Sequence, residues 1–354
     1  MRLAVHVDFD LGKATGVSRY GVELTRQLDI MGHLRELWVP RDVRDECCRL
    51  EGLSAVIRHF PFPRRATDWA CPSLWRRWGA LDAVISPAGR VFPPTAGSQA
   101  AMVHDMGPFV APGLKAPGDA LTWRRRIERT VRRARMIAVN SNFTLEALLE
   151  HFPGASRRTT VTPLGIDHFR RREPSGKAAH ILAVGTLEPR KNYRRLIEAF
   201  AGLCARDPDV PPLVIVGKDG FRSEELRGVP ETLGIESRIR FAGYVPEDDL
   251  SRLYADAACL VHPALEEGFG FTVAEAFAWG LPVAAASGSA TQEYFRGAVE
   301  LFDPNCVNAI RDAVSGCLKR GVTRAQLERR EELFRELTWE RCAGLTLEAL
   351  ERLL

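Results

Sequence analysis

Residues 263–282 read Pro263-Ala-Leu-Glu-Glu-Gly-Phe-Gly-Phe-Thr-Val-Ala-Glu-Ala-Phe-Ala-Trp-Gly-Leu-Pro282. An apolar run that ends at His262 precedes this stretch, so the pattern predicts a strand, a glycine-rich turn and a helix from about Phe271 to Trp279. Gly280 and Pro282 end the helix, because a glycine favours helix termini and a proline cannot continue the hydrogen-bond ladder.

The start of that helix predicts an anion site. Its first backbone amides have no partner within the helix, its dipole is positive there, and Gly268 and Gly270 let a ligand approach the backbone. Glu267 lies before the helix and Glu275 lies more than one turn inside it. A carboxylate repels a phosphate, so each carboxylate suits a neutral hydroxyl-bearing group, such as ribose or a hexose. Together these features predict a sugar-nucleotide site, whereas each alone is equally an acidic turn or a surface glutamate.

Outside this window, short apolar runs alternate with amphipathic stretches, a pattern typical of parallel sheets covered by helices. The expected strands of the first half are Arg2–Val7, Leu37–Val39, Ala55–His59, Ala83–Ser86, Ala100–His104 and Met136–Asn140. The charged stretch 170–177, which contains Pro174 and Gly176, predicts a linker. The expected strands after it are His180–Val184, Leu213–Val216, Ile239–Ala242, Ala258–His262 and Pro282–Ala286. The chain of 354 residues is long enough for two such α/β units.

The spacing of Glu267 and Glu275 resembles the Glu-x7-Glu motif of glycosyltransferase family 4 (group 1), and the resemblance covers nearly the whole chain. It implies an α/β protein of the GT-B fold, with two Rossmann-like domains that face a cleft. It divides the chain into an acceptor-binding domain (1–170), a sugar-nucleotide-binding domain (178–335) and a terminal helix (338–354) that crosses back to the first domain. Helical spacing after Thr338 fits this helix, and an oligomer-forming helix is the alternative.

Four further segments carry the resemblance: 161–167, 185–192, 213–220 and 241–246. The resemblance implies donor-binding roles for the backbone or side chains of Gly16, Thr186, Tyr244, Val245, Gly268, Phe269, Gly270 and Glu275. Thr186 departs from the family, because many relatives have arginine at that place.

Arg190 and Lys191 are expected to act on the leaving group. A nucleoside diphosphate gains negative charge as the glycosidic bond breaks, and fixed cations stabilise that charge in the transition state. Lys191 matches the family, while Arg190 is either a second cation or a surface charge. The cysteines and histidines show no metal-ligand spacing, so no metal and no cofactor are expected, and the nucleotide sugar is a substrate.

In the first half, Gly16 follows the first strand in a loop that is neither a Rossmann nor a phosphate-loop motif. The resemblance places this loop against the donor phosphates and the acceptor. His104 and Asp105 end another strand, at the edge where open α/β sheets bind ligands. His104 is either structural or a contact of the transferred sugar, and the resemblance favours the contact.

The net charge of +4 conceals an asymmetry, because residues 1–170 hold 25 basic and 17 acidic side chains and residues 171–354 hold 24 and 28. Arginines and tryptophans gather in the first half, and Arg125, Arg129, Arg132 and Arg133 are expected to share one helix face. Such a face is either solvated or attracted to anionic lipid headgroups. No nucleic-acid motif accompanies it. The scattered cysteines and the polar start predict a reduced cytoplasmic protein, with peripheral contact to the inner membrane face as the only membrane contact.

The resemblance implies a retaining glycosyltransferase that moves a hexose to a glycan or lipid-linked oligosaccharide in surface polysaccharide assembly. Bacterial mannosyltransferases are similar, which favours mannose from GDP-mannose over rhamnosyl or glucosyl transfer from a dTDP- or UDP-sugar. A sugar-nucleotide hydrolase or epimerase of the same fold is the main alternative, and a non-catalytic sugar-nucleotide scaffold is another.

Overall fold

The computed structural model describes residues 1–12, 15–43, 50–63, 66, 81–92 and 98–354. Cys47, Cys48, Cys71 and part of the expected basic and aromatic cluster (Arg64, Arg65, Trp69 and residues 75–78) lie outside these residues. The chain forms two compact units. The first unit comprises Met1–Val110, Ala120–Gly165 and Leu337–Leu354, and the second comprises Ala111–Asp119 and Ile166–Glu336.

The first unit contains one parallel sheet in the order β3-β2-β1-β4-β5-β6-β7. Its strands are β1 (Leu3–His6), β2 (Leu34–Val39), β3 (Val56–His59), β4 (Ala83–Ser86), β5 (Ser98–Val103), β6 (Met136–Val139) and β7 (Thr159–Val161). Its helices are α1 (Gly16–Ile30), α2 (Gly107–Val110), most of α3 (Pro117–Arg133), α4 (Asn142–His151) and α13 (Trp339–Leu353). β1 and β4 are buried along their whole length, which explains their continuous apolar sequence.

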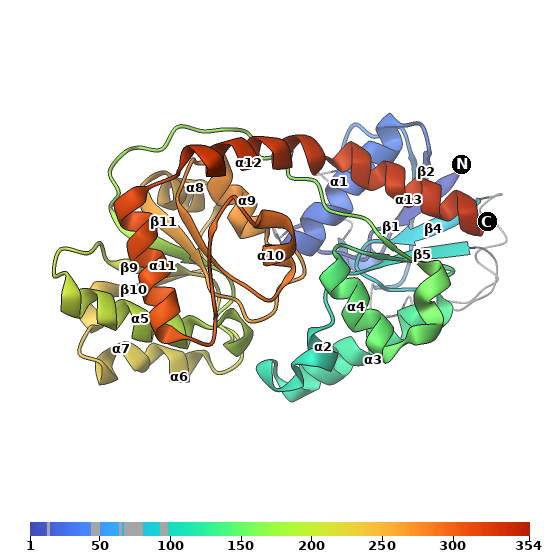
Figure 1. Cartoon of the computed structure of the whole chain (residues 1–354). Helices are drawn as coiled ribbons and strands as arrows, with labels where there is room; N and C mark the ends of the chain where they lie inside the picture. The colour runs from blue at the N-terminus through green and yellow to red at the C-terminus, as the bar shows by residue number, and fades with distance from the viewer. Residues whose placement is uncertain (13–14, 44–49, 64–65, 67–80, 93–97) are drawn as a thin grey trace. The chain divides into compact units, whose positions relative to one another are not determined.

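The second unit contains a second parallel sheet in the order β10-β9-β8-β11-β12-β13. Its strands are β8 (His180–Val184), β9 (Leu213–Val216), β10 (Ile239–Gly243), β11 (Ala257–His262), β12 (Val283–Ala286) and β13 (Glu300–Phe302). Its helices are α5 (Tyr193–Arg206), α6 (Ser223–Arg227), α7 (Val229–Thr232), α8 (Glu247–Ala255), α9 (Phe271–Ala278), α10 (Ala290–Phe295), α11 (Val307–Arg320) and α12 (Arg324–Glu336). Helices α5 and α11 lie side by side and share a core with the buried faces of β8 and β9 (Figure 1).

Every strand expected from the sequence is present, with ends shifted by at most a few residues. The short edge strands β7 and β13 were not predicted, because three residues are too few for a recognisable pattern. The helix expected after the glycine-rich turn is α9, which ends one residue earlier than predicted.

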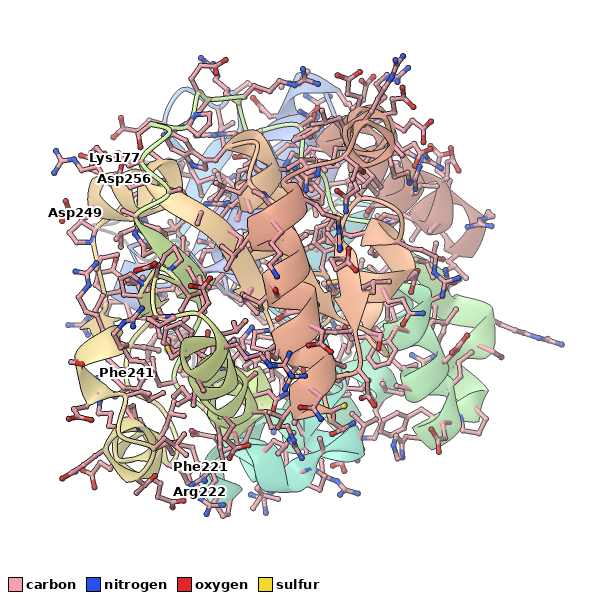
Figure 2. The ribbon with its side chains drawn as sticks, turned by 60° about the vertical axis from the view of Figure 1, so that its left-hand side comes forward. Lys177, Phe221, Arg222, Phe241, Asp249 and Asp256 are labelled. Atoms are coloured by element: carbon pink, nitrogen blue, oxygen red, sulfur yellow. The ribbon has the colours of Figure 1, made fainter. Side chains whose placement is uncertain are left out.

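The chain passes from the first unit to the second between Gly165 and Ile166, a few residues before the predicted end of the first domain. The stretch 170–177 is exposed but is tied to the second unit. The Arg172 amide donates to the carbonyl of Ala278 (2.8 Å), and the side chains of Lys177 and Asp256 form an ion pair (3.1 Å; Figure 2). The predicted linker is therefore a strap on the surface of the second unit.

Helix α13 belongs to the first unit and lies against α1 (Figure 1). The Thr338 hydroxyl caps it by accepting from the Arg341 amide. Trp339 is buried beside Tyr20. Gly165 lies so close that a Cβ there would be 2.4 Å from the Trp339 amide nitrogen, so a larger residue would displace the start of the helix.

Both sheets reverse their strand order at one point, between β1 and β4 in the first unit and between β8 and β11 in the second. Open parallel sheets bind ligands beyond the carboxyl ends of the strands at this point. The loops that follow these four strands are therefore the expected ligand-binding regions of the two units.

Candidate active site

In the second unit, Lys191 and Glu267 meet at the reversal point of the sheet. Lys191 ends a short 3-10 helix, Pro189–Lys191, after β8, and Glu267 follows β11. The Lys191 ammonium donates to Oε2 of Glu267 at 2.6 Å. Lys191 is 8% exposed, which is unusual for a lysine without a partner, and the ion pair accounts for its burial.

Local backbone geometry fixes the lysine. Asn192 has a left-handed conformation (φ 58°), which turns the chain into α5, and its side-chain amide donates from Nδ2 to the carbonyl of Pro304. The amide of Leu265 donates to the carbonyl of Arg190 at 2.8 Å. This hydrogen bond joins the loop after β8 to the loop after β11 and so holds Lys191 and Glu267 close to each other.

Arg190 lies beside the pair. Its guanidinium donates to Glu188 and to the carbonyl of Glu266, and its Nη1 is 3.9 Å from Oε2 of Glu267. Two cations therefore surround one carboxylate. Burial by itself raises the pKa of Glu267, but the charges of Lys191 and Arg190 outweigh burial and hold that pKa well below its usual range. Glu267 is ionised at neutral pH and acts as a hydrogen-bond acceptor.

His262 is a site residue that the sequence analysis treated only as the end of a strand. It is 3% exposed, and its Nε2 lies 3.6 Å from Oε2 of Glu267. Burial and, after it, the charge of Lys191 lower the pKa of His262 to about 4. The signal that could have identified it is a histidine at the carboxyl end of a buried strand, directly before the glycine-rich turn.

The turn before α9 leaves backbone amides for a ligand. Gly270 occupies the N-cap in a left-handed conformation (φ 106°), and no side chain caps the helix there. Gly268 is buried beside it. The ring of Phe269 packs among Phe271, Tyr294 and Phe295, so only the backbone of Phe269 is available to a donor.

The remaining donor-binding candidates of the second unit lie around the same sheet edge. Glu275 accepts a hydrogen bond from the buried Tyr254 hydroxyl at 2.8 Å and stands apart from the pairing of Lys191 with Glu267. Tyr244 follows β10 with 69% of its surface exposed, and Val245 is next to it. Thr186 follows β8, and its methyl group packs against Gly220, where a Cβ would come within 2.7 Å.

Gly16 and His104 belong to the first unit. Gly16 is the first residue of α1, and Thr15 caps that helix. Nε2 of His104 lies 2.8 Å from the Pro87 carbonyl, which only accepts, so we assign the proton to this nitrogen. Burial lowers the pKa of His104, which keeps the ring neutral.

His104 lines a cavity of about 230 Å³ at the reversal point of the first sheet, together with Thr15, Ser18, Arg90, Trp123 and Arg126. Asp8, which no sequence motif marks, also lines this cavity. The Asp8 carboxylate accepts from the amides of Ala88 and Arg90, each at 2.9 Å, and so joins the loops after β1 and β4. Burial raises the pKa of Asp8 to about 6, although these two amides act in the opposite direction.

The predicted basic face of α3 is only partly exposed. Arg125 and Arg132 are exposed, whereas Arg129 and Arg133 are half-buried. The reason is that Ile127, Thr130 and Val131 turn toward the core and bring the flanking positions with them. Arg133 donates to the carbonyl of Val91 instead of facing solvent.

Among the described residues, no three histidine, cysteine, aspartate or glutamate side chains are grouped in a way that could hold a metal ion. In the same part of the chain, no helix has both the length and the apolar composition needed to cross a membrane.

Comparison with known proteins matches two family models in succession. Residues 14–170 match Glycosyltransferase Family 4, and residues 166–333 match Glycosyl transferases group 1. The O-antigen chain mannosyltransferase B of Escherichia coli is 25% identical over 376 residues, with 96% of each chain covered. A D-inositol 3-phosphate glycosyltransferase of Corynebacterium glutamicum is 34% identical over 182 residues, which cover 46% of this chain and 44% of that protein.

Solved structures agree on the fold. Anabaena HepE in complex with UDP and glucose has a TM-score of 0.74 at 17% identity and covers 99% of this chain and 100% of its own. Sucrose-phosphate synthase from Thermosynechococcus elongatus has a TM-score of 0.73 at 19% identity, with 99% and 98% covered. These matches confirm the expected GT-B fold. With both family models matched in order along the chain, this protein belongs to the group 1 glycosyltransferases of family 4.

Proposed function

We propose that this chain is a retaining hexosyltransferase, which moves a hexose from a nucleoside diphosphate sugar to a hydroxyl of a glycan or lipid-linked oligosaccharide. The observation that carries the proposal is the part-buried contact between Lys191 and Glu267 at the reversal point of the second sheet. A cation for the leaving group and a carboxylate for the sugar stand side by side where ligands of this fold class bind.

Different residues of the second unit bind different parts of the donor. Lys191 and Arg190 stabilise the negative charge that develops on the diphosphate, and the amides of residues 268–270 add neutral donors to the same oxygens. Glu267 accepts hydrogen bonds from the hydroxyls of the hexose. Glu275, oriented by Tyr254, accepts from the ribose, and Tyr244 with Val245 lies along the base.

The anomeric configuration of the hexose is retained if the acceptor hydroxyl attacks the same face of the sugar from which the diphosphate leaves. The bond from the anomeric carbon to the phosphate oxygen breaks with its electron pair going to the phosphate. The bond from that carbon to the acceptor oxygen forms, and the acceptor proton moves to the departing phosphate oxygen. In this scheme Glu267 stays a hydrogen-bond acceptor and forms no bond to carbon, which agrees with its close ion pair.

The similarity to a full-length O-antigen mannosyltransferase favours mannose as the transferred sugar, with GDP-mannose as its donor. We place the acceptor in the cavity of the first unit. Its volume of about 230 Å³ lies below the range of about 300–1,000 Å³ usual for drug-sized ligands, so it suits one terminal sugar. The Trp123 ring offers an apolar surface for stacking, and Arg126 lies over that ring at 5.5 Å.

A donor panel tests this proposal. GDP-, UDP-, ADP- and dTDP-sugars are each added to the protein, and the thermal midpoint is measured. A ligand at 100 times its dissociation constant stabilises by about 2.7 kcal/mol. GDP-mannose is expected to give the largest shift. NMR of the glycoside formed with a polysaccharide-derived acceptor is then expected to show the anomeric configuration of the donor.

Variants distinguish the residues that act on the donor from those that bind the acceptor. Glu267→Gln and Lys191→Ala are expected to lower transfer at least about a hundredfold, as loss of one transition-state contact does in other enzymes. Trp123→Ala is expected to raise KM for the acceptor and leave KM for the donor unchanged. Rapid conversion of a labelled donor to a free or altered sugar without acceptor would instead identify a hydrolase or epimerase. No shift with any donor would contradict the proposal altogether.

A further inference from the structure

The buried imidazole of His262 stands next to the ion pair but does not take part in it. Its Nδ1 is 3.0 Å from the hydroxyl of Thr272, a residue in the first turn of α9. Its Nε2 lies 3.6 Å from Oε2 of Glu267, just beyond hydrogen-bond length. Among the described residues, none forms a hydrogen bond with this Nε2. A buried ring nitrogen without a hydrogen bond calls for an explanation.

The surroundings of His262 define its protonation. Lys191, Arg190 and Glu267 are the charged groups that act on it, and burial with the two cations keeps the ring neutral. A carboxylate can only accept, so the neutral form that suits Glu267 carries its proton on Nε2. Nδ1 then accepts from the Thr272 hydroxyl. We therefore assign a chain of two donors, from Thr272 to His262 and from His262 toward Glu267.

The distance to Glu267 is long because Oε2 already receives the Lys191 ammonium at 2.6 Å. In the proposed function, however, Lys191 turns to the diphosphate of the donor. Glu267, whose side chain is only 20% exposed, would then be without its closest cation, which is unfavourable. A movement of less than about 1 Å would bring Oε2 within hydrogen-bond length of Nε2.

We propose that Glu267 exchanges partners when the donor binds, leaving Lys191 and accepting a hydrogen bond from Nε2 of His262. His262 is thus a positioning residue, held by Thr272, that directs Glu267 toward the hydroxyls of the hexose. This inference rests on the proposed function for the identity of the ligand. Its geometry can be tested without any ligand.

The ligand-free test removes the cation by mutation. In Lys191→Met, Glu267 loses the same contact that donor binding would take from it. Proton-nitrogen NMR of the histidine rings, with His262→Gln used to identify the signal, is expected to show a proton on Nε2 in the wild type. In Lys191→Met that proton is expected to shift downfield and exchange more slowly with water. A proton on Nδ1, or an Nε2 signal unchanged by Lys191→Met, would overturn the exchange whatever the donor panel shows.

The kinetic test uses variants that differ in one donor atom. His262→Phe keeps a ring of similar size without a donor, and His262→Gln offers an amide N–H in place of Nε2–H. His262→Phe is expected to lower kcat at least tenfold with little change in the affinity for the free nucleotide, and His262→Gln is expected to recover much of that loss. Thr272→Val, which lacks the hydroxyl, is expected to give a smaller loss of kcat, and Thr272→Ser, which restores the hydroxyl, is expected to recover most of that loss.

A pH profile excludes a purely structural role. Without the hydrogen bond from His262, the ionised form of Glu267 is less stabilised in the donor complex, so its pKa rises. The acidic limb of kcat is therefore expected to move to higher pH in His262→Phe and to return in His262→Gln. If His262→Phe lowers only the thermal midpoint and leaves kcat and the acidic limb unchanged, His262 is structural and the proposal is wrong.

Discussion

At the scale of single residues, burial and charges that are distant in sequence shift the pKa values of two carboxylates, Asp8 and Glu267, in opposite directions. Asp8 and Glu267 are both carboxylates after the first or fourth strand of a parallel sheet. Burial raises the pKa of Asp8 despite the two amides that donate to it, whereas the charges of Lys191 and Arg190 outweigh burial at Glu267 and lower its pKa. Two carboxylates near the reversal points of the two sheets therefore have opposite pKa shifts.

Asp8 predicts a pH dependence of stability. Its pKa rises from 3.8 to about 6 on folding, so the folded state holds a proton that the unfolded state releases above about pH 4. Its contribution to stability is therefore full below about pH 4 and is lost between pH 4 and pH 6. The loss is about 3 kcal/mol, at about 1.4 kcal/mol per unit of pKa.

The measurement compares the thermal midpoints of the wild type and Asp8→Asn from pH 4 to pH 7. The thermal midpoint of Asp8→Asn is expected to rise relative to that of the wild type as the pH increases. Asp82→Asn is the matched control on the same sheet. Because the Arg2 amide lowers the pKa of Asp82, the contribution of Asp82 to stability changes mainly below about pH 4, so the difference between Asp82→Asn and the wild type is expected to stay nearly constant from pH 4 to pH 7. Parallel curves for the wild type and Asp8→Asn would contradict the assignment.

At the scale of elements, one buried arginine joins α12 to α9. Arg330 on α12 is 4% exposed and donates to the carbonyls of Leu281 (2.9 Å) and Ala298 (3.1 Å). Its guanidinium lies 4.3 Å from the centroid of the Phe277 ring on α9. Burial lowers the pKa of Arg330 to about 10, which still leaves it charged at neutral pH. The position of α9 therefore depends on a residue far from the site in sequence.

Arg330→Ala is expected to destabilise the second unit by about 3 kcal/mol, because two carbonyls lose charged donors and a cavity remains. Arg330→Lys is expected to recover part of this, since an ammonium cannot reach both carbonyls with the geometry of the guanidinium fork. Urea unfolding measures both effects. Arg324→Ala on the exposed face of the same helix is the control, with an expected change within about 0.5 kcal/mol. Equal effects at the two positions would contradict this role.

At the scale of the whole molecule, the excess of basic residues lies in the first half of the sequence. We propose that the exposed side of α3, with Arg125, Arg132 and the half-exposed Leu121, attracts an anionic lipid surface. Each basic residue near such a surface contributes about 1 kcal/mol.

Arg125→Glu with Arg132→Glu is expected to weaken binding to phosphatidylglycerol vesicles at least tenfold. Wild-type binding is expected to fall as salt rises from about 50 to about 500 mM. Flotation of vesicles measures both. Lys319→Glu with Arg324→Glu in the second unit carries the same change in charge and is expected to have little effect. If both double variants weaken binding equally, the attraction depends on the net charge of the protein and not on α3, which would contradict the proposal.

The strands, the glycine-rich turn, α9 and the spacing of Glu267 and Glu275 were predictable from sequence, because apolar runs, helical periodicity and glycine positions act locally. The edge strands β7 and β13 were not, since three residues carry too little pattern. The family also followed from local motifs, and the comparisons confirm it.

The tertiary structure alone decided which of these residues meet. Lys191 and Glu267 are 76 positions apart and come together because β8 and β11 are neighbours in the sheet. The contact of His262 with Glu267, the burial of Arg330 and the hydrogen bonds that Asp8 accepts from two amides are seen only in the folded structure. Contacts between distant residues depend on strand order and on desolvation, and neither is encoded in any short stretch of the chain.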